Sequence, residues 1–296
     1  MIDRYQLRYF LAVVDTGNFS RAASRMNVTQ PTLSAGVAKL EKALGARLFF
    51  RNSQRVHLTA EGTRLLNRAR AVENEFNALE GAAREALDAP LVRLGVLTTI
   101  PTRLIERVVR GRGGAGGEER LEIIEGTERD LLARLDRGRI DAALTLLREG
   151  SSRFASEALF KEGYGLAMPD SHPFAQDAVV DGVKLAQEVM IVRRQCEVLS
   201  LTSRHFTDLG VRPEFSFRTH NDDKALAMVR AGLGITVMPM SYRSEGVSRP
   251  RLAGFDHERV VGLLFAAHAG ALRTGASPLI AAVRQELYAD AASGFS

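Results

Sequence analysis

Residues 18–45, NFSRAASRMNVTQPTLSAGVAKLEKALG, decide the fold of the N-terminal region. They predict two short helices that are separated by a turn at Asn27, because asparagine tolerates the left-handed backbone conformation of such turns. We expect Ser20 to cap the first of these helices. Thr29 should cap the second, with Pro31 in its first turn, where a missing N–H costs nothing. Upstream, apolar residues at helical spacing predict a further helix that ends at Gly17: Leu7, Phe10, Val13 and Val14.

The helix that follows Thr29 is expected to have two contrasting faces. One face should be a buried stripe of Leu33, Val37, Leu40 and Leu44, and Gly45 should end the helix. The opposite face carries small or hydrogen-bonding residues and no acid: Gln30, Thr32, Ser34, Ala35 and Lys39. A helix in the major groove of DNA needs such a face, because base edges are read by amide, hydroxyl and methyl contacts. The alternative is an ordinary three-helix bundle with a solvated polar face.

The distribution of charge favours the DNA-binding interpretation. Residues 1–62 contain nine Lys/Arg and four Asp/Glu, a net charge of +5 that equals the net charge of the whole chain. The remaining residues are balanced, with 31 basic and 31 acidic side chains. Concentrated positive charge is what neutralisation of DNA phosphates requires.

Two short apolar runs, 48–50 and 56–58, predict a β-hairpin directly after this helix. The loop between them carries Arg51 and Arg55, which can contact the DNA backbone or enter the minor groove. The N-terminal segment is therefore predicted to be a winged helix-turn-helix that binds double-stranded promoter DNA.

The run from Leu7 to Arg51, LRYFLAVVDTGNFSRAASRMNVTQPTLSAGVAKLEKALGARLFFR, together with VHLTAEG at 56–62, resembles the LysR-type transcriptional regulators. The resemblance implies that Gln30, Pro31, Thr32 and Ser34 approach bases, and that Arg51 or Arg55 lies on the wing. Four further residues complete the expected DNA-binding set: Ser20, Arg21, Thr29 and Lys39. Ala35 departs from the family, since many members place Arg or Lys there, so one common contact is absent.

A heptad pattern follows from Thr59 over about thirty residues. Apolar residues alternate at spacings of four and three: Leu65, Ala69, Val72, Phe76, Leu79, Ala83 and Ala86. Such a seam predicts a two-stranded helical contact, and a dimer would supply the second DNA half-site. The alternative is a lone amphipathic helix that lies on its own domain. The resemblance implies a linker helix that pairs antiparallel in a dimer, and a homotetramer.

From residue 91 the pattern changes to apolar strands alternating with amphipathic helices, which predicts a doubly wound α/β layer. We expect two such lobes, joined by crossing strands near 160–165 and 264–267. The phrases EGTERDLLARLDRGRIDAAL (125–144) and AMVRAGLGITVMPMSY (227–242) resemble the periplasmic-binding-protein-like effector domain of the same family. The predicted fold is thus α+β multi-domain: the winged helix-turn-helix (1–62), the linker helix (63–89) and an effector-binding domain (90–296). Lobe I is expected at 91–163 plus 267–296, and lobe II at 164–266.

An unidentified small-molecule effector is expected in the cleft between the lobes, because ligands bind beyond the carboxyl ends of strands in open α/β sheets. On lobe I the candidate contacts are Thr98, Thr99, Ile100 and Thr127. For each threonine, a helix cap is an equally good interpretation. On lobe II the candidates are Gln195, Cys196, Thr202 and Met238.

Cys196 is the single cysteine, so an intramolecular disulfide and a thiolate zinc cluster are excluded. Arg193 and Arg194 could lower its pKa, and peroxide-sensing relatives place a reactive cysteine in roughly this region. They also use a second, resolving cysteine that this chain lacks, so a structural or cleft-lining thiol is the favoured interpretation.

The sequence contains no metal-ligand spacing among its histidines and no GxSxG or HExxH motif, so neither an enzyme nor a cofactor is expected. No apolar run reaches eighteen residues and charges interrupt MIDRYQLRYF, which predicts a cytoplasmic protein without a membrane partner. Two functions remain open at this point. One is a ligand-responsive regulator, and the other is a constitutive DNA-binding protein whose lobes serve oligomerisation only.

Overall fold

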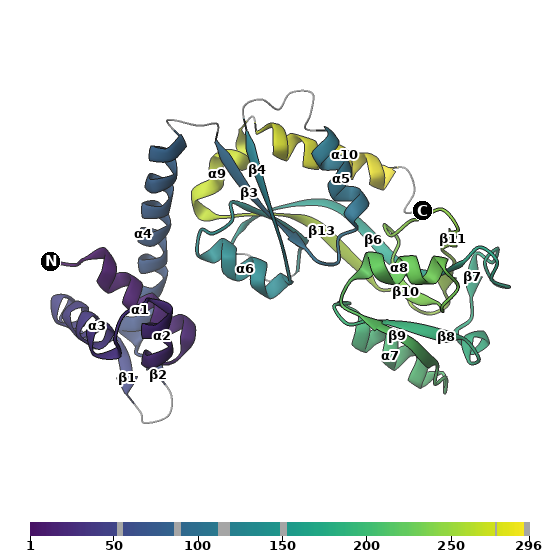
Figure 1. The fold of residues 1–296 in the computed structure, drawn as a ribbon, viewed down its shortest axis with the longest axis horizontal. Helices are drawn as coiled ribbons and strands as arrows, with labels where there is room; N and C mark the ends of the chain where they lie inside the picture. Colours follow the sequence, from purple (N-terminus) through teal and green to yellow (C-terminus); the bar gives the residue numbers. More distant parts are fainter. Residues whose placement is uncertain (52–55, 86–89, 112–118, 149–152, 276, 293–296) are drawn as a thin grey trace. The chain divides into compact units, whose positions relative to one another are not determined.

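The computed structural model describes residues 1–51, 56–85, 90–111, 119–148, 153–275 and 277–292 (Figure 1). The chain divides into two compact units, Met1–Asp88 with Asp136–Gly138, and Ala89–Leu135 with Arg139–Ser296. The glycine-rich stretch 112–117 and the predicted end of the linker helix at 89 lie outside the described residues.

The N-terminal unit is a helix-turn-helix with a two-stranded wing, as the sequence predicts. Its elements are α1 (Arg4–Thr16), α2 (Phe19–Arg25), α3 (Gln30–Leu44), β1 (Phe49–Arg51), β2 (Val56–Leu58) and α4 (Ala60–Glu85). Gly17 ends α1 and Gly45 ends α3, both in the left-handed conformation, with φ of 64° and 66°. Asn27, with φ of 54°, makes the predicted turn between α2 and α3. Thr29 caps α3 by accepting a hydrogen bond from the Thr32 amide.

Two details of this unit differ from the sequence prediction. Asn18, and not Ser20, caps α2: its side chain accepts from the Arg21 amide, and the helix starts one residue before Ser20. Asparagine is as good a cap as serine, and its position one residue before Phe19 lets that ring pack inward beside Phe49. Leu44 is 37% exposed, because α3 ends at Gly45 before the buried stripe can continue.

The core of the N-terminal unit forms where α1, α2 and α3 meet. Phe10, Leu33 and Val37 are fully buried there, and the Phe10 ring lies 5.3 Å from the Phe49 ring of the wing. Helix α4 closes this core from its own first turns, since Ala69 is buried in it and Leu65 packs against it. The linker helix and the helix-turn-helix therefore share one hydrophobic core.

Lobe I of the C-terminal unit is a parallel layer extended by antiparallel strands. Its strands are β3 (Leu91–Leu97), β4 (Arg120–Gly126), β5 (Ala142–Leu146), β13 (Glu258–Phe265) and the first part of β6 (Ala155–Pro169). Its helices are α5 (Thr102–Gly111), α6 (Glu128–Asp136), η3 (Ala267–Ala269), α9 (Gly270–Thr274) and α10 (Pro278–Ala292). Strand β3 pairs in parallel with β4 on one side and β5 on the other. Helices α5 and α10 cover one face of the sheet and α6 the other (Figure 1).

The two lobes are joined by the antiparallel pair β6 and β13, which runs through the middle of a seven-stranded sheet. Six of its strands follow the order β10-β6-β13-β5-β3-β4, with β10 at Thr236–Pro239, and the seventh, β11 (Val247–Ser248), pairs with β6 off this path. The predicted crossing at 160–165 is correct for β6. The predicted crossing at 264–267 is wrong, because β13 pairs with β6 from Glu258 onward and is already inside the lobe I core at Val261. The lobe boundary proposed at 266/267 therefore moves to the start of β13.

Lobe II contains the second part of β6 together with the segments between β6 and β13. Its other elements are β7 (Val179–Val180), η2 (Gly182–Leu185), β8 (Val189–Arg193), α7 (Leu199–Asp208), β9 (Glu214–Thr219), α8 (Asp222–Arg230), β10 (Thr236–Pro239), β11 (Val247–Ser248) and β12 (Arg251–Leu252). Strands β8 and β9 are parallel, and Met190 bridges to Ile235 next to β10.

The strands of lobe II separate two hydrophobic cores, because alternate side chains point to opposite faces. Leu166, Met190 and Val237 lie in the core on the α7 side. Their neighbours Ala167, Ile191 and Met238 lie in the core that α8 covers. This alternation decides toward which of the two cores each predicted effector contact in these strands points.

Candidate functional site

Helix α3 presents the predicted polar face to solvent. Gln30, Thr32 and Lys39 are exposed, and Ser34 is half-buried. The Gln30 amide donates to the Ser34 hydroxyl at 3.1 Å, and the hydroxyls of Thr29 and Thr32 lie 2.7 Å apart. These contacts join residues three and four positions apart, so the helix itself preorganises the amide and hydroxyl groups. The same groups can read base edges in a major groove.

Residues at the start of α2 lie free for phosphate contact. Because Asn18 is the cap, the hydroxyl of exposed Ser20 is not used to hold the helix. Arg21 is exposed in the same first turn. Backbone amides and hydroxyls at a helix N-terminus are common phosphate ligands.

The wing is an antiparallel pair in which Phe49 lies opposite Leu58 and Arg51 opposite Val56. The backbone of Arg51 belongs to β1, but its side chain lies outside the described residues, as does Arg55 altogether. Their contact with DNA stays a prediction.

The predicted heptad seam of α4 splits into two parts. Leu65 and Ala69 pack into the core of their own unit, which is the role of a helix lying on its own domain. Further along, Val72, Phe76 and Leu79 are 40%, 38% and 65% exposed. The Arg4 guanidinium lies 4.7 Å from the centre of the Phe76 ring, so α1 covers only one side of this stripe. The side chain of Ala83 and all of Ala86 lie outside the described residues.

In the C-terminal unit the two lobes meet around a buried polar group that we call the hinge cluster: Thr99, Glu162, Tyr164, Glu197, Ser241 and Arg259. Arg259 of β13 is its centre. Its guanidinium bonds Glu162 of β6 at 2.8 Å and Glu197 at 2.5 Å. It also donates to the hydroxyl and the carbonyl oxygen of Thr99, at 3.1 and 3.0 Å. Arg259 therefore connects the joining strands to lobe I and lobe II at once.

The other members of the hinge cluster complete the hydrogen bonding. The Tyr164 hydroxyl donates to Glu197 at 2.9 Å, and the Ser241 amide donates to Glu162 at 2.6 Å. Two further bonds join the lobes beside the cluster. Arg103 of α5 donates to the Ser241 carbonyl at 2.6 Å, and the Thr102 hydroxyl donates to Asp223 at 2.6 Å.

The pKa shifts in the hinge cluster follow from burial and from the ion pairs. Burial opposes the charged form of Arg259, but the carboxylates of Glu162 and Glu197 outweigh it and raise the pKa of the guanidinium. Burial also opposes ionisation of Glu197, but the Arg259 charge outweighs it and lowers the pKa of this carboxyl. Burial and the neighbouring Glu197 raise the pKa of Tyr164, so this hydroxyl stays protonated and donates. Two further arginines lie beside the cluster: Arg103 donates to the Ser241 carbonyl, and Arg249 interacts electrostatically with Glu162.

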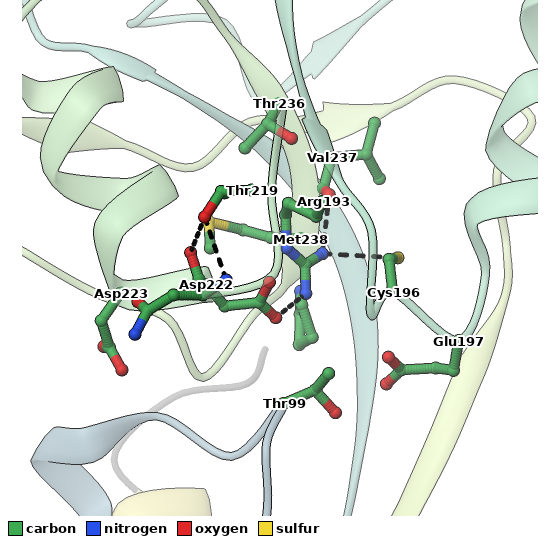
Figure 2. A network of polar contacts seen from close by, with 12 residues as sticks. Thr99, Arg193, Cys196, Glu197, Thr219, Asp222, Asp223, Thr236, Val237 and Met238 are labelled. Carbon is green, nitrogen blue, oxygen red and sulfur yellow. Dashed lines mark hydrogen bonds and ion pairs between the residues drawn. The ribbon is translucent and has the colours of Figure 1, made fainter. Parts of the chain in front are cut away.

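A second buried ion pair lies in lobe II between Arg193 of β8 and Asp222 of α8, both 1% exposed (Figure 2). Arg193 also donates to the Val237 carbonyl at 2.9 Å and to the Cys196 sulfur at 3.5 Å. Burial raises the pKa of Cys196, and the opposing effect of Arg193 is smaller. The Cys196 thiol is therefore mainly protonated at neutral pH, which agrees with a structural or cleft-lining role.

The structure brings some of the predicted effector contacts together and disperses others. Thr99 belongs to the hinge cluster, while Cys196 and Thr202 line a cavity inside lobe II. Thr98 is half-buried at the end of β3, and its amide bonds the Gly126 carbonyl. Gln195 is half-buried in the turn between β8 and α7.

Two of the predicted effector contacts lie inside hydrophobic cores, and a third residue has the capping role. Ile100 is 5% exposed in the core of lobe I, because the backbone turns inward after Thr99. Met238 is fully buried under α8, on the sheet face opposite to Val237. Thr127 accepts from the Asp130 amide at 3.3 Å and donates to its carboxylate at 2.7 Å, so it caps α6.

Sequence reasoning missed the buried charges that organise this unit: Glu162, Glu197, Arg259, Arg193 and Asp222. A signal for two of them was present. Glu162 interrupts an apolar strand, and Arg259 directly precedes the apolar run VVGLLF. A charge at either position must be paired when the strand is buried.

The described residues hold no group of three or more His, Cys, Asp or Glu side chains that could bind a metal ion. Within the same residues, no helix combines the length and the apolar character that crossing a bilayer requires.

Comparison with known proteins decides the family. Residues 5–63 match the bacterial regulatory helix-turn-helix protein of the lysR family, and residues 85–287 match the LysR substrate binding domain. The chain belongs to the LysR family. A Mycobacterium avium relative described as a probable hydrogen peroxide-inducible genes activator is 33% identical, over 89% of this chain and 88% of its own. The Escherichia coli K12 DNA-binding transcriptional dual regulator OxyR is 29% identical, over 88% of each chain.

Solved structures agree on the fold. A full-length OxyR variant from Pseudomonas aeruginosa has a TM-score of 0.58 at 24% identity, covering 97% of this chain and 95% of its own. Full-length BenM has a TM-score of 0.51 at 24% identity, covering 98% and 97%. This LysR-family chain is a ligand-responsive, DNA-binding transcriptional regulator and not an enzyme. The reading of its C-terminal lobes as oligomerisation modules alone is not supported.

Proposed function

We propose that this regulator binds promoter DNA through α3 and the wing, and that it responds to a small molecule where the two lobes meet. The observation that carries the DNA part is the exposed, acid-free face of α3, whose amide and hydroxyl groups are fixed by bonds within the helix. The observation that carries the effector part is Arg259, which bonds both lobes at once.

In this proposal Gln30, Pro31, Thr32 and Ser34 approach base edges. The residues that contact phosphates or the minor groove are Ser20, Arg21, Thr29, Lys39, Arg51 and Arg55. Base contacts specify the sequence, whereas phosphate contacts set affinity and its dependence on salt. Because promoter DNA is the partner, we place the protein in the cytoplasm.

A duplex from the region upstream of the chain's own gene, labelled with a fluorophore, tests the DNA part by anisotropy. We expect nanomolar binding at physiological salt and at least a thousandfold preference over a scrambled duplex. Equal affinity for both duplexes at every salt concentration would contradict sequence-specific reading.

The effector part follows from the position of the hinge cluster. Thr99 of lobe I and Glu197 of lobe II both bond Arg259, so a molecule bound beside this arginine meets groups of both lobes. An effector that contacts Thr98 or Thr99 on lobe I and Gln195 or Cys196 on lobe II would favour the closed form by its differential affinity.

Thermal unfolding in the presence of matched sets of neutral, cationic and anionic metabolites tests this part. A true effector raises the melting temperature by mass action, and we expect such an increase from at least one of these compounds. No increase from any set would favour a constitutive DNA-binding protein.

Self-association is proposed through the exposed stripe of α4 formed by Val72, Phe76 and Leu79. Paired α4 helices would set the distance between two helix-turn-helix units, which two-fold operators require. Two dimers would make the tetramer that the family resemblance implies. Sedimentation of Val72→Ser/Leu79→Ser against the unchanged protein tests this, with Glu75→Ser as the control. We expect only the double variant to dissociate.

Hydrogen peroxide is a second candidate effector, because the M. avium relative is described as a peroxide-inducible activator and Arg193 donates to the Cys196 sulfur. The Cys196 thiolate would attack one peroxide oxygen, the O–O bond would break, and sulfenic acid and hydroxide would form. The raised pKa of Cys196 and the lack of a second cysteine argue against it. Mass spectrometry after equimolar peroxide decides the matter: rapid gain of one oxygen at Cys196 would favour this candidate.

A further inference from the structure

Lobe II contains a cavity of about 770 Å³ on the α7 side of its sheet. Its walls come from β8, α7, the segment before β9 and β10, and all lining residues lie between Met190 and Val237. No described residue of lobe I lines it, and it adjoins the junction through Cys196 and Glu197, the residue that pairs with Arg259. Cavities that hold small organic ligands usually have volumes of roughly 300–1,000 Å³.

The cavity exists because α7 fills its side of the sheet poorly. Phe206 is the one fully buried residue of α7, and the positions around it are the hydroxyl residues Thr202, Ser203 and Thr207. On the opposite face α8 buries Ala225, Leu226 and Val229 in a filled core. A hollow of this size with a mainly apolar lining can hold a small organic molecule.

The lining fits an uncharged and largely apolar occupant. Apolar side chains predominate, among them Met190, Phe206 and Phe215. Two charged side chains in the wall are already neutralised from outside the cavity, Arg193 by Asp222 and Glu197 by Arg259. A third, Arg212, is exposed to water at the rim. A charged occupant would therefore lose hydration without gaining a buried counter-charge.

We propose that this cavity is a second ligand site, which takes an uncharged, mainly apolar small molecule between α7 and strands β8 and β10. The site goes beyond the proposed effector site at the lobe junction. It is coupled to that junction through Glu197, which lines the cavity and accepts hydrogen bonds from Arg259 and Tyr164. Occupancy of the cavity thus acts on a residue that holds the lobes together.

The neutral fluorophore N-phenyl-1-naphthylamine, titrated into the full-length protein, tests the site. We expect saturable binding with a stoichiometry of one per chain, and at least tenfold weaker binding by Thr202→Phe, whose ring fills the cavity. Thr98→Phe, the same exchange on lobe I at the junction, should bind the fluorophore as the unchanged protein does. Loss of binding in Thr98→Phe with retention in Thr202→Phe would place the probe at the junction and overturn the proposal.

Two further measurements use the unchanged protein, so they do not depend on the folding of a variant. Bound N-phenyl-1-naphthylamine should slow alkylation of Cys196 by N-ethylmaleimide at least fivefold, because the thiol lies in the cavity wall. The anionic probe 8-anilino-1-naphthalenesulfonate should bind at least tenfold more weakly than the neutral one. Unprotected Cys196, or equal affinity for the anion, would overturn the proposal. The titrations with Thr202→Phe and Thr98→Phe separate this site from the junction, whether or not an effector binds at Arg259.

Discussion

The polar face of α3 and the hinge cluster are both built from hydrogen-bonding side chains, but they are assembled in opposite ways. On α3 the contacts join residues three or four apart, such as Gln30 and Ser34, and the groups stay exposed. In the hinge cluster Arg259 bonds residues 62, 97 and 160 positions away, and its charge is buried. The exposed face that meets DNA is thus held by contacts within one helix. The buried cluster that joins the two lobes forms only when the whole C-terminal unit has folded.

This contrast predicts that the largest loss of stability comes from the hinge cluster. Arg259→Met should lower the free energy of unfolding of the C-terminal unit by about 3–5 kcal/mol, because it leaves two buried carboxylates without their counter-charge. Calorimetry of the full chain should show this loss as a separate unfolding transition of the C-terminal unit at a lower temperature. The triple variant Arg259→Met/Glu162→Gln/Glu197→Gln is the control and should recover part of the loss. A triple variant as unstable as Arg259→Met would show that packing, and not the uncompensated charge, causes the effect.

The α3 face should behave in the opposite manner, with function affected and stability preserved. Gln30→Ala should weaken binding to the specific operator by about 1–3 kcal/mol, with little change in the salt dependence. Arg55→Ala should reduce the slope of log affinity against log salt by about one, because one phosphate contact is lost. Anisotropy titrations between low and physiological salt measure both quantities.

A control for Gln30→Ala is Glu75→Ala, an exposed position of α4 outside α3 and the wing. It should leave operator affinity unchanged. If Gln30→Ala and Arg55→Ala shifted affinity and salt slope alike, the separation of base readers from phosphate contacts would be wrong.

The join between α4 and the wing offers a test of intermediate size. A Cβ atom at Gly62 would lie 2.2 Å from the Leu48 carbonyl oxygen, which is backbone and cannot rotate away. Gly62→Ala should therefore destabilise the N-terminal unit by about 1–2 kcal/mol, since the overpacking cost exceeds the gain in helix propensity. Glu61→Ala on the exposed side should change stability by less than about 0.5 kcal/mol. Thermal unfolding followed by circular dichroism distinguishes them, and equal melting temperatures would contradict the close approach of α4 to the wing.

The lowered pKa of Glu197 predicts a dependence of stability on acid. A carboxyl whose folded pKa lies below its unfolded value of about 4.3 stabilises the fold above that pH and loses the contribution as the pH falls through the folded pKa. The melting temperatures of the unchanged protein and Glu197→Gln should therefore converge between pH 7 and pH 3. A constant difference over this range would show that Glu197 keeps the same proton occupancy in both states.

The smallest expected effect concerns Cys196. Because burial raises its pKa, the thiolate fraction near pH 7 is small, and alkylation should be slower than that of a free cysteine. The alkylation rate should keep rising up to pH values above the pKa of an ordinary thiol. N-ethylmaleimide kinetics from pH 6 to pH 10 measure this, with glutathione as reference. A rate at pH 7 equal to or above that of glutathione would restore the redox interpretation.

The sequence predicted the local features well because their causes are local. Thr29, Pro31, Asn27 and Gly45 each act on the backbone within a few residues, so their roles could be named before the fold was known. The displaced cap at Asn18 shows the limit of this reasoning. Two good capping residues stand two positions apart, and packing of Phe19 beside Phe49 favours the first.

The effector region was less predictable because its contacts depend on distant segments. Ile100 and Met238 stand at strand ends, as a ligand contact would, but the turn after Thr99 and the alternation of β10 bury them. Glu162 and Arg259 indicated the site better than the strand ends did, because a charge in an apolar strand needs a partner in the folded protein. Their partners could not be named, since pairing β6 with β13 brings together residues almost a hundred positions apart.

The core that Leu65 and Ala69 share with the helix-turn-helix has a mechanical consequence. Because no hinge intervenes between these side chains and α3, a twist of the linker about its long axis turns the recognition helix by the same angle. A rotation of the C-terminal part of α4 would therefore change the orientation of α3 relative to a DNA groove.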